Sequence, residues 1–185
     1  VAARILDKGL KFKMPKVEKI QSQPHSILYH ASQSMPHTSS GYAIRTHGLT
    51  SSLNSKGYDV DVFLRNGYPL DRSDFKGSDV NTEEKIENVT YHFSHTEPND
   101  SSLINYQEVY NFNRLDEYES QAINALISNG SKSKPIAIHS ASNFVVGLAG
   151  ARAAKALGIP SIYEIRGFWH LTQSTKREGL SLIHI

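Results

Sequence analysis

The chain has 185 residues, 38% of them hydrophobic and 21% charged, which is ordinary for a globular protein and excludes a disordered chain. Its net charge of +2 comes from a basic start, residues 1–26, so the remainder lacks the positive charge of a general nucleic-acid binder. No apolar run is long enough to span a membrane, and the absence of cysteine excludes disulfides and thiolate chemistry. We therefore expect a soluble, cytoplasmic protein that does not bind nucleic acid.

The two ends of the chain differ from its middle. Residues 1–23 carry five lysines among few apolar residues, which predicts a basic linker or a partly helical lead-in. The last six residues, 180–185, read LSLIHI, which is what a transposon end used in sequencing libraries encodes in frame. We treat them as a non-native tail derived from an adapter and exclude them from the fold prediction. We expect one domain, at residues 24–179, within a longer protein.

The domain is predicted to be built around residues 27–46, which form a short apolar run, a polar turn and the start of a helix. The apolar run at 27–31 is too short for a buried helix and predicts a strand covered on both faces. Ser39 and Ser40 are candidate N-caps for a helix at 42–56. Gly41 lets backbone amides approach a ligand closely, and the free amides of a helix N-terminus bind anions. The unit is therefore able to hold a phosphate.

The rest of the chain alternates between strand and helix patterns. Residues 106–128 have apolar side chains at helical spacing, and residues 144–157 are rich in small side chains, which lets a helix lie close to a sheet. Residues 65–88 are polar and turn-rich, and we expect their acidic side chains to be solvated rather than to bind a metal. The predicted strands after the first one cover residues 58–64, 89–93, 135–139 and 161–165.

Short strands that alternate with helices form parallel sheets through βαβ units. The sequence therefore predicts an α/β fold, a Rossmann-like doubly wound parallel sheet with helices on both faces. Ligands of such sheets bind beyond the carboxyl ends of the strands where the winding direction reverses, which is expected between the first and fourth strands. This rule brings two loops, at 30–41 and 139–143, side by side.

Two side chains are candidates for chemistry at this edge of the sheet. His139 is expected at the last position of the fourth strand, where its imidazole would point into the crevice; a histidine that only terminates the strand is the alternative. Arg166 follows the fifth strand. It would either clamp a phosphate or carboxylate through its guanidinium or pair with Glu164, which should lie on the same face.

Several nucleotide and metal motifs are missing from the sequence. The loop after the first strand has one glycine rather than the G-x-G-x-x-G of dinucleotide-binding proteins, and there is no P-loop. There is also no G-x-S-x-G elbow and no histidine pair spaced for a metal. We therefore expect neither a cofactor nor a metal.

The motifs at the strand ends resemble those of one enzyme family. From about residue 26 to residue 176, the chain resembles the N-terminal half of family 4 (group 1) glycosyltransferases of GT-B architecture. The resemblance rests on SSGY at 39–42, IHS at 138–140, the alanine-rich stretch at 149–157, GIP at 158–160 and YEIRGFW at 163–169.

This resemblance implies a retaining glycosyltransferase that moves a sugar from a nucleotide-sugar donor to a glycan, lipid or small-molecule acceptor. Ser40 and Gly41 would face the donor diphosphate, His139 would contact the donor sugar near the reacting centre, and Arg166 and Gly167 would line the cleft. The donor would bind mainly to a C-terminal domain absent from these residues, so the fragment is expected to be inactive alone. Peripheral membrane association is compatible with such an enzyme but not indicated here.

Two alternatives remain open from the sequence. One is a sugar-nucleotide epimerase of the same two-domain architecture. The other is a noncatalytic α/β binding module. A receiver-like module would need acidic residues at the end of the first strand, where His30, Ala31 and Ser32 stand instead.

Overall fold

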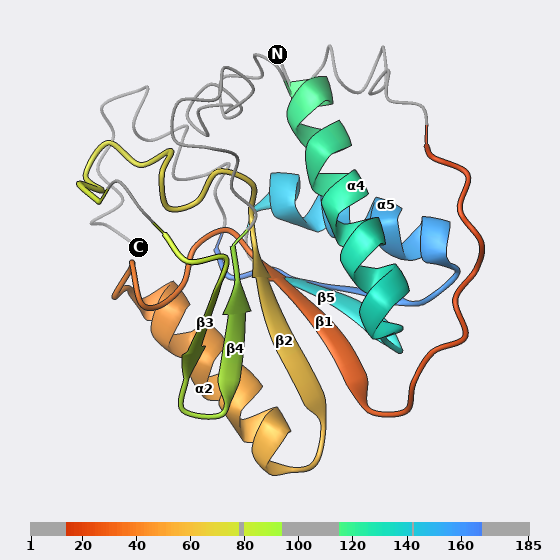
Figure 1. Cartoon of the computed structure of the whole chain (residues 1–185), viewed down its shortest axis with the longest axis horizontal. Coiled ribbons are helices and arrows are strands. Elements are labelled where there is room, and N and C mark those ends of the chain that lie inside the picture. The colour runs from red at the N-terminus through yellow and green to blue at the C-terminus, as the bar shows by residue number, and fades with distance from the viewer. Residues whose placement is uncertain (1–13, 78–79, 94–114, 142, 168–185) are drawn as a thin grey trace, which may run out of the picture.

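The structure, a computed structural model, describes residues 14–77, 80–93, 115–141 and 143–167 (Figure 1). Its helices are α2 (Gly41–Ser55), α4 (Leu115–Ser133) and α5 (Phe144–Leu157). Its strands are β1 (Ser26–Ala31), β2 (Asp59–Leu64), β3 (Glu83–Ile86), β4 (Val89–His92), β5 (Ala137–Ala141) and β6 (Ser161–Glu164).

The six strands form one sheet in the order β3-β4-β2-β1-β5-β6. All neighbouring pairs are parallel except β3 and β4, which form an antiparallel hairpin. β1 lies between β2 and β5, so the winding direction reverses at β1 and β5, as the sequence predicted. The predicted α/β fold with a Rossmann-like, mostly parallel sheet is confirmed.

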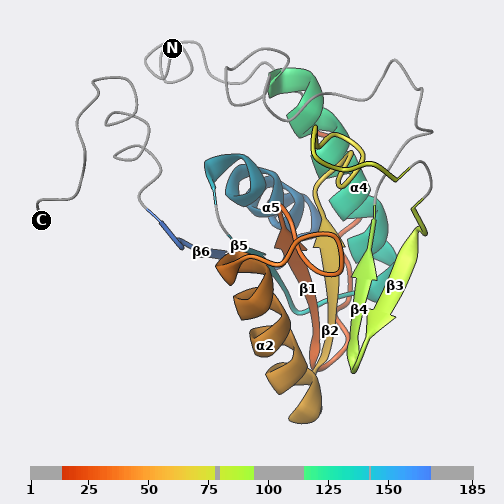
Figure 2. The ribbon, with the colours of Figure 1, turned by 90° about the vertical axis from the view of Figure 1, so that its left-hand side faces the viewer.

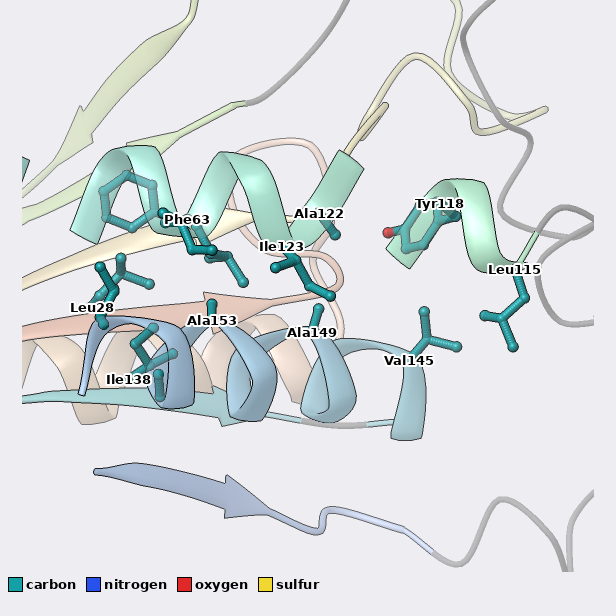
Figure 3. Close-up of a cluster of buried hydrophobic side chains, with 14 residues drawn as sticks. Leu28, Phe63, Leu115, Tyr118, Ala122, Ile123, Ile138, Val145, Ala149 and Ala153 are labelled. Atoms are coloured by element: carbon teal, nitrogen blue, oxygen red, sulfur yellow. The ribbon is translucent and has the colours of Figure 1, made fainter. Parts of the chain in front are cut away.

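Helices cover both faces of the sheet (Figures 1 and 2). α4 and α5 pack over one face, where the side chains of Leu28 and Ile138 join theirs in a buried apolar cluster (Figure 3). α2 covers the other face, where Tyr29 belongs to a second cluster with Leu49 and Leu53 of the helix. Successive residues of a strand point to opposite faces, so the odd-numbered residues of β1 and β5 lie on the α2 face.

Three expectations about element boundaries need correction. β5 extends to Ala141, two residues beyond the predicted end, because the backbone of β1 continues to pair with it. A strand at Glu83–Ile86 was not predicted, because its charged sequence has no apolar pattern; the turn at Glu87 (φ 53°) folds it back onto β4. The predicted helix at 106–128 is found as α4, which continues to Ser133; its predicted start at 106–114 lies outside the described residues.

The two edges of the sheet expose different side chains. β3 forms one edge and has the sequence EEKI, with Glu83 and Lys85 exposed. β6 forms the other, where Ile162 is 49% exposed and Tyr163 is 43% exposed, and Ile165, which follows the strand, is 64% exposed.

The packing of α5 on the sheet depends on Gly150. A Cβ atom there would lie 1.9 Å from the Oγ of Ser140 and 3.1 Å from its Cβ, whereas one at Gly48 in α2 would meet nothing within 4 Å. We expect G150A to lower the free energy of unfolding by about 1–3 kcal/mol through overpacking. G48A is the matched control and should raise it by roughly 0.5–1 kcal/mol, because alanine loses less backbone entropy in a helix. Urea unfolding of both variants measures these changes. An equal change in the free energy of unfolding for G150A and G48A would show that α5 shifts on the sheet and accommodates the added methyl group.

Two absences concern the described part of the chain only. None of its helices combines the length and the apolar character that crossing a membrane requires. Within the same residues, no three histidine or acidic side chains come together in a group suited to a metal ion.

Candidate functional site

The start of α2 lies at the carboxyl edge of the sheet and is built as predicted. Ser40 is the N-cap, and its side-chain oxygen accepts a hydrogen bond from the backbone amide of Ala43 at 3.3 Å. Gly41 is the first residue of the helix, and a Cβ built there would meet no atom within 4 Å. The space beside Gly41 is therefore open, which leaves room for a ligand near the first turn.

His139 lies in the middle of β5, not at its end as predicted, because the strand continues through Ser140 and Ala141. Its side chain is on the α2 face, where its ring packs on that of Tyr29 with the centroids 4.6 Å apart. The side chain is 15% exposed, and its Nε2 atom is buried. Burial lowers the pKa of His139 below the usual 6.5, with the charge of Arg166 acting in the same direction. The imidazole is therefore neutral at pH 7.

Glu164, the last residue of β6, is the centre of a network on this face. Its Oε2 atom accepts a hydrogen bond from the hydroxyl of Tyr29 at 3.0 Å and another from Nη2 of Arg166 at 2.9 Å. The same oxygen lies 3.4 Å from Nε2 of His139, a contact that lacks the alignment of a hydrogen bond. Oε1 is paired with the Nη2 atom of Arg45 at 2.6 Å.

Arg166 joins β6 to the first turns of α2. Its Nη1 donates to the backbone oxygen of Tyr42 at 2.9 Å and to Oγ1 of Thr46 at 2.8 Å, and its Nη2 donates to the hydroxyl of Tyr29 at 2.5 Å as well as to Glu164. The side chain is 3% exposed. Arg166 and Glu164 lie on the same side, as the alternation along the strand predicted. The guanidinium thus donates to four acceptors and links β1, α2 and β6 by hydrogen bonds.

The charges of the network explain the protonation states of its members. Burial alone would raise the pKa of Glu164, but the hydrogen bond and charge of Arg166, the hydroxyl of Tyr29 and the charge of Arg45 together hold it below its usual value. Burial raises the pKa of the Tyr29 hydroxyl, which therefore stays protonated. The network thus has a fixed carboxylate, two cations and a neutral histidine.

Of the five predicted site residues, the structure shows two, His139 and Arg166, at the same carboxylate. His139 and Arg166 meet at Glu164, and α2, which Ser40 caps and Gly41 begins, is tied to the same carboxylate by Arg45. Gly167 is half-buried and is the last described residue; Phe168 and Trp169 lie outside the described part.

The sequence did not single out Tyr29, Arg45 and Thr46 as site residues. A signal exists for Thr46 alone: the buried residues of α2, which are Ala43, Thr46 and Thr50, are small and partly polar rather than apolar.

The loop after β1 is anchored to the loop after β2. The hydroxyl of Tyr68 donates to the backbone oxygen of Ser34 at 2.6 Å and lies 2.6 Å from Oγ1 of Thr38. The ring of His37 makes edge contacts with Phe75 and Phe93, whose centroids lie 5.4 and 5.2 Å away. These contacts fix the loop that leads from β1 into α2.

Comparisons with known proteins add little to this picture. No protein-family model matches the chain, and no curated protein is significantly similar to it. Among solved structures, the chain is similar to the C-terminal domain of a hydrogenase from Pyrococcus furiosus, with 8% sequence identity and a TM-score of 0.47. The match covers 84% of this chain and 96% of the other. At this level of similarity it carries no information about activity.

Proposed function

We propose that the chain is the acceptor-side domain of a retaining glycosyltransferase of GT-B architecture, which uses a nucleotide-sugar donor in the cytoplasm. The observation that supports this proposal best is the position of the resembling motifs. The SSGY, IHS and YEIRG segments come from three separate parts of the chain, yet Tyr42, His139 and the Glu164–Arg166 pair lie close together on the α2 face, toward the carboxyl edge of the sheet. This edge is where open α/β sheets bind ligands.

The protonation state of His139 suits glycosyl transfer. In a retaining transferase, positive charge develops at the anomeric carbon as the diphosphate leaves, and a charged imidazole beside it would oppose the reaction. A neutral ring that accepts a hydrogen bond from a donor hydroxyl avoids this repulsion, and the interaction is useful to the extent that it strengthens in the transition state. The rate then depends on His139 more than the ground-state affinity does.

The test uses the protein with its downstream sequence, incubated with a panel of nucleotide sugars, while release of the free nucleotide and transfer to added acceptors are measured. We expect H139A to lower kcat about 10²-fold or more, on the order of 3 kcal/mol in activation free energy. Because the ring packs on Tyr29, the variant should also lose about 1 kcal/mol of stability.

H92A is the matched control. His92 is also partly buried in a strand, at 26% exposure, and lies beside two carboxylates, those of Asp61 and Glu83. This variant should lose a similar amount of stability and keep its turnover per folded molecule. A change in kcat of less than about threefold for H139A would remove the residue from the site.

The remaining functional alternatives give other outcomes in the same assay. A sugar-nucleotide epimerase would convert the donor into an isomeric sugar without transfer to an acceptor. A noncatalytic module would bind a nucleotide sugar, or another ligand, with no turnover. The isolated chain is expected to transfer no sugar, because the donor-binding half of the cleft would belong to the second domain.

A further inference from the structure

We propose that Glu164 is a positioning residue that keeps the proton of the neutral His139 on Nε2 and so presents Nδ1 as the hydrogen-bond acceptor for a ligand hydroxyl. This inference deepens the proposed function and rests on it for the identity of the ligand, a hydroxyl of the donor sugar. The placement of the proton itself depends only on the described side chains.

The first step concerns the two ring nitrogens of His139. A neutral imidazole has one N–H and one lone pair, and the neighbour of each nitrogen decides which is which. Nε2 is buried and lies 3.4 Å from Oε2 of Glu164. A lone pair that faces a carboxylate at this distance is repelled by it, whereas an N–H is attracted. The proton therefore belongs on Nε2.

The second step is that Glu164 is itself fixed. Its two oxygens are bound by Tyr29, Arg166 and Arg45, at 3.0, 2.9 and 2.6 Å. These donors hold the pKa of Glu164 below its ordinary value, although burial alone would raise it. The carboxylate therefore stays charged at neutral pH and cannot turn away from the imidazole without breaking contacts to β1, to α2 and to Arg166.

The third step concerns the part of the ring that a ligand is able to reach. The side chain keeps 15% of its surface exposed, and Nε2 is among the buried polar atoms without a hydrogen-bond partner, whereas Nδ1 is not. The described residues give Nδ1 no hydrogen-bond partner. Nδ1 is thus the polar atom that remains for a ligand, and the lone pair placed there accepts a hydrogen bond from a hydroxyl.

The network also explains why a charged cluster is kept in this position. A buried ion pair adds little net stability compared with apolar side chains of the same size. Glu164 raises the pKa of His139, whereas burial and Arg166 lower it, so the network adjusts both the charge and the proton position of one side chain. A packing role alone would not require two arginines on one carboxylate.

Long-range ¹H–¹⁵N NMR correlation on the 185-residue chain tests the proposal without any substrate. The chain has nine histidines, and H139Q identifies the signals of His139 by their loss. At pH 7 we expect the wild-type ring to be neutral, with the proton on Nε2 and an unprotonated Nδ1. In E164Q the ring should become a mixture of both tautomers, and its pKa should fall further because the carboxylate that raises it is gone.

E84Q is the matched control, because Glu84 lies 3.6 Å from another histidine, His37. It should leave the His139 signals unchanged. A wild-type His139 with its proton on Nδ1 would overturn the proposal even if E164Q failed to fold. An unchanged tautomer and pKa in a folded E164Q would overturn it as well. Neither result depends on glycosyl transfer, so the proposal and the proposed function can fail separately.

Discussion

Replacing Arg166 with methionine is expected to lower the free energy of unfolding by about 3 kcal/mol, as removal of one partner from a buried ion pair does. The guanidinium is 3% exposed and donates hydrogen bonds to Tyr29, Tyr42, Thr46 and Glu164. Methionine fills a similar volume but donates none of these bonds. The loss leaves several polar atoms unsatisfied in a site that water reaches poorly, and their desolvation accounts for most of the effect.

Arg45 provides the matched control, because it pairs with the same carboxylate of Glu164 from the solvent side. Its side chain is 62% exposed, so R45M should cost less than about 1 kcal/mol, as exposed pairs do. Urea unfolding of both variants at pH 7 and moderate ionic strength measures the difference. Equal losses for R166M and R45M would mean that the Arg166 network is as open to water as the Arg45 contact.

Glu119 is expected to make the protein less stable as the pH rises. This carboxyl group in α4 is fully buried, and neither of its oxygens has a hydrogen-bond donor among the described residues. Burial raises its pKa from 4.5 to about 8, which the nearby charge of Arg152 only partly offsets. The native state thus keeps a proton between about pH 4.5 and pH 8 that the unfolded chain has lost.

The unfolded state binds fewer protons in that window, so the free energy of unfolding falls as the pH rises through it, by up to ~1.4 kcal/mol per pH unit. E119Q keeps the shape of the side chain but cannot ionise. We expect it to match the wild type near pH 5 and to be more stable by roughly 2–4 kcal/mol near pH 8.5. A wild-type stability that does not fall between pH 5 and pH 8.5 relative to E119Q would show that Glu119 ionises freely.

The fold was predictable because its signals are local. Apolar runs, helix caps and turn residues each concern a few neighbouring positions, and β1, β2 and α5 follow them closely. β3 was missed because its stability comes from pairing with β4, which the charged sequence EEKI does not reveal. The end of β5 was placed too early for a similar reason: Ser140 and Ala141 are compatible with a turn, and it is the ladder to β1 that keeps them extended.

The site was predictable as a region but not as a set of contacts. The rule for parallel sheets located the region: Arg166 follows the end of β6 there, whereas His139 lies two residues before the end of β5 and reaches Glu164 from within the strand. The sequence could not show that Tyr29 would act as a polar partner, since an aromatic residue within an apolar strand equally well indicates core packing. Nor could it show that Arg166 would turn inward to Thr46, because that depends on the distance between α2 and β6 in three dimensions.

The two edges of the sheet expose different side chains, and this difference determines through which edge two copies of the chain would associate. An edge strand has unpaired backbone groups that are able to add a strand from another chain, and charged side chains oppose such addition. β3, with Glu83, Glu84 and Lys85, is protected in this way. β6 is not, because its exposed side chains include Ile162 and Tyr163, with Ile165 next to them. Self-association of the described domain in concentrated solution would therefore begin at β6, and a lysine introduced at Ile162 would oppose it.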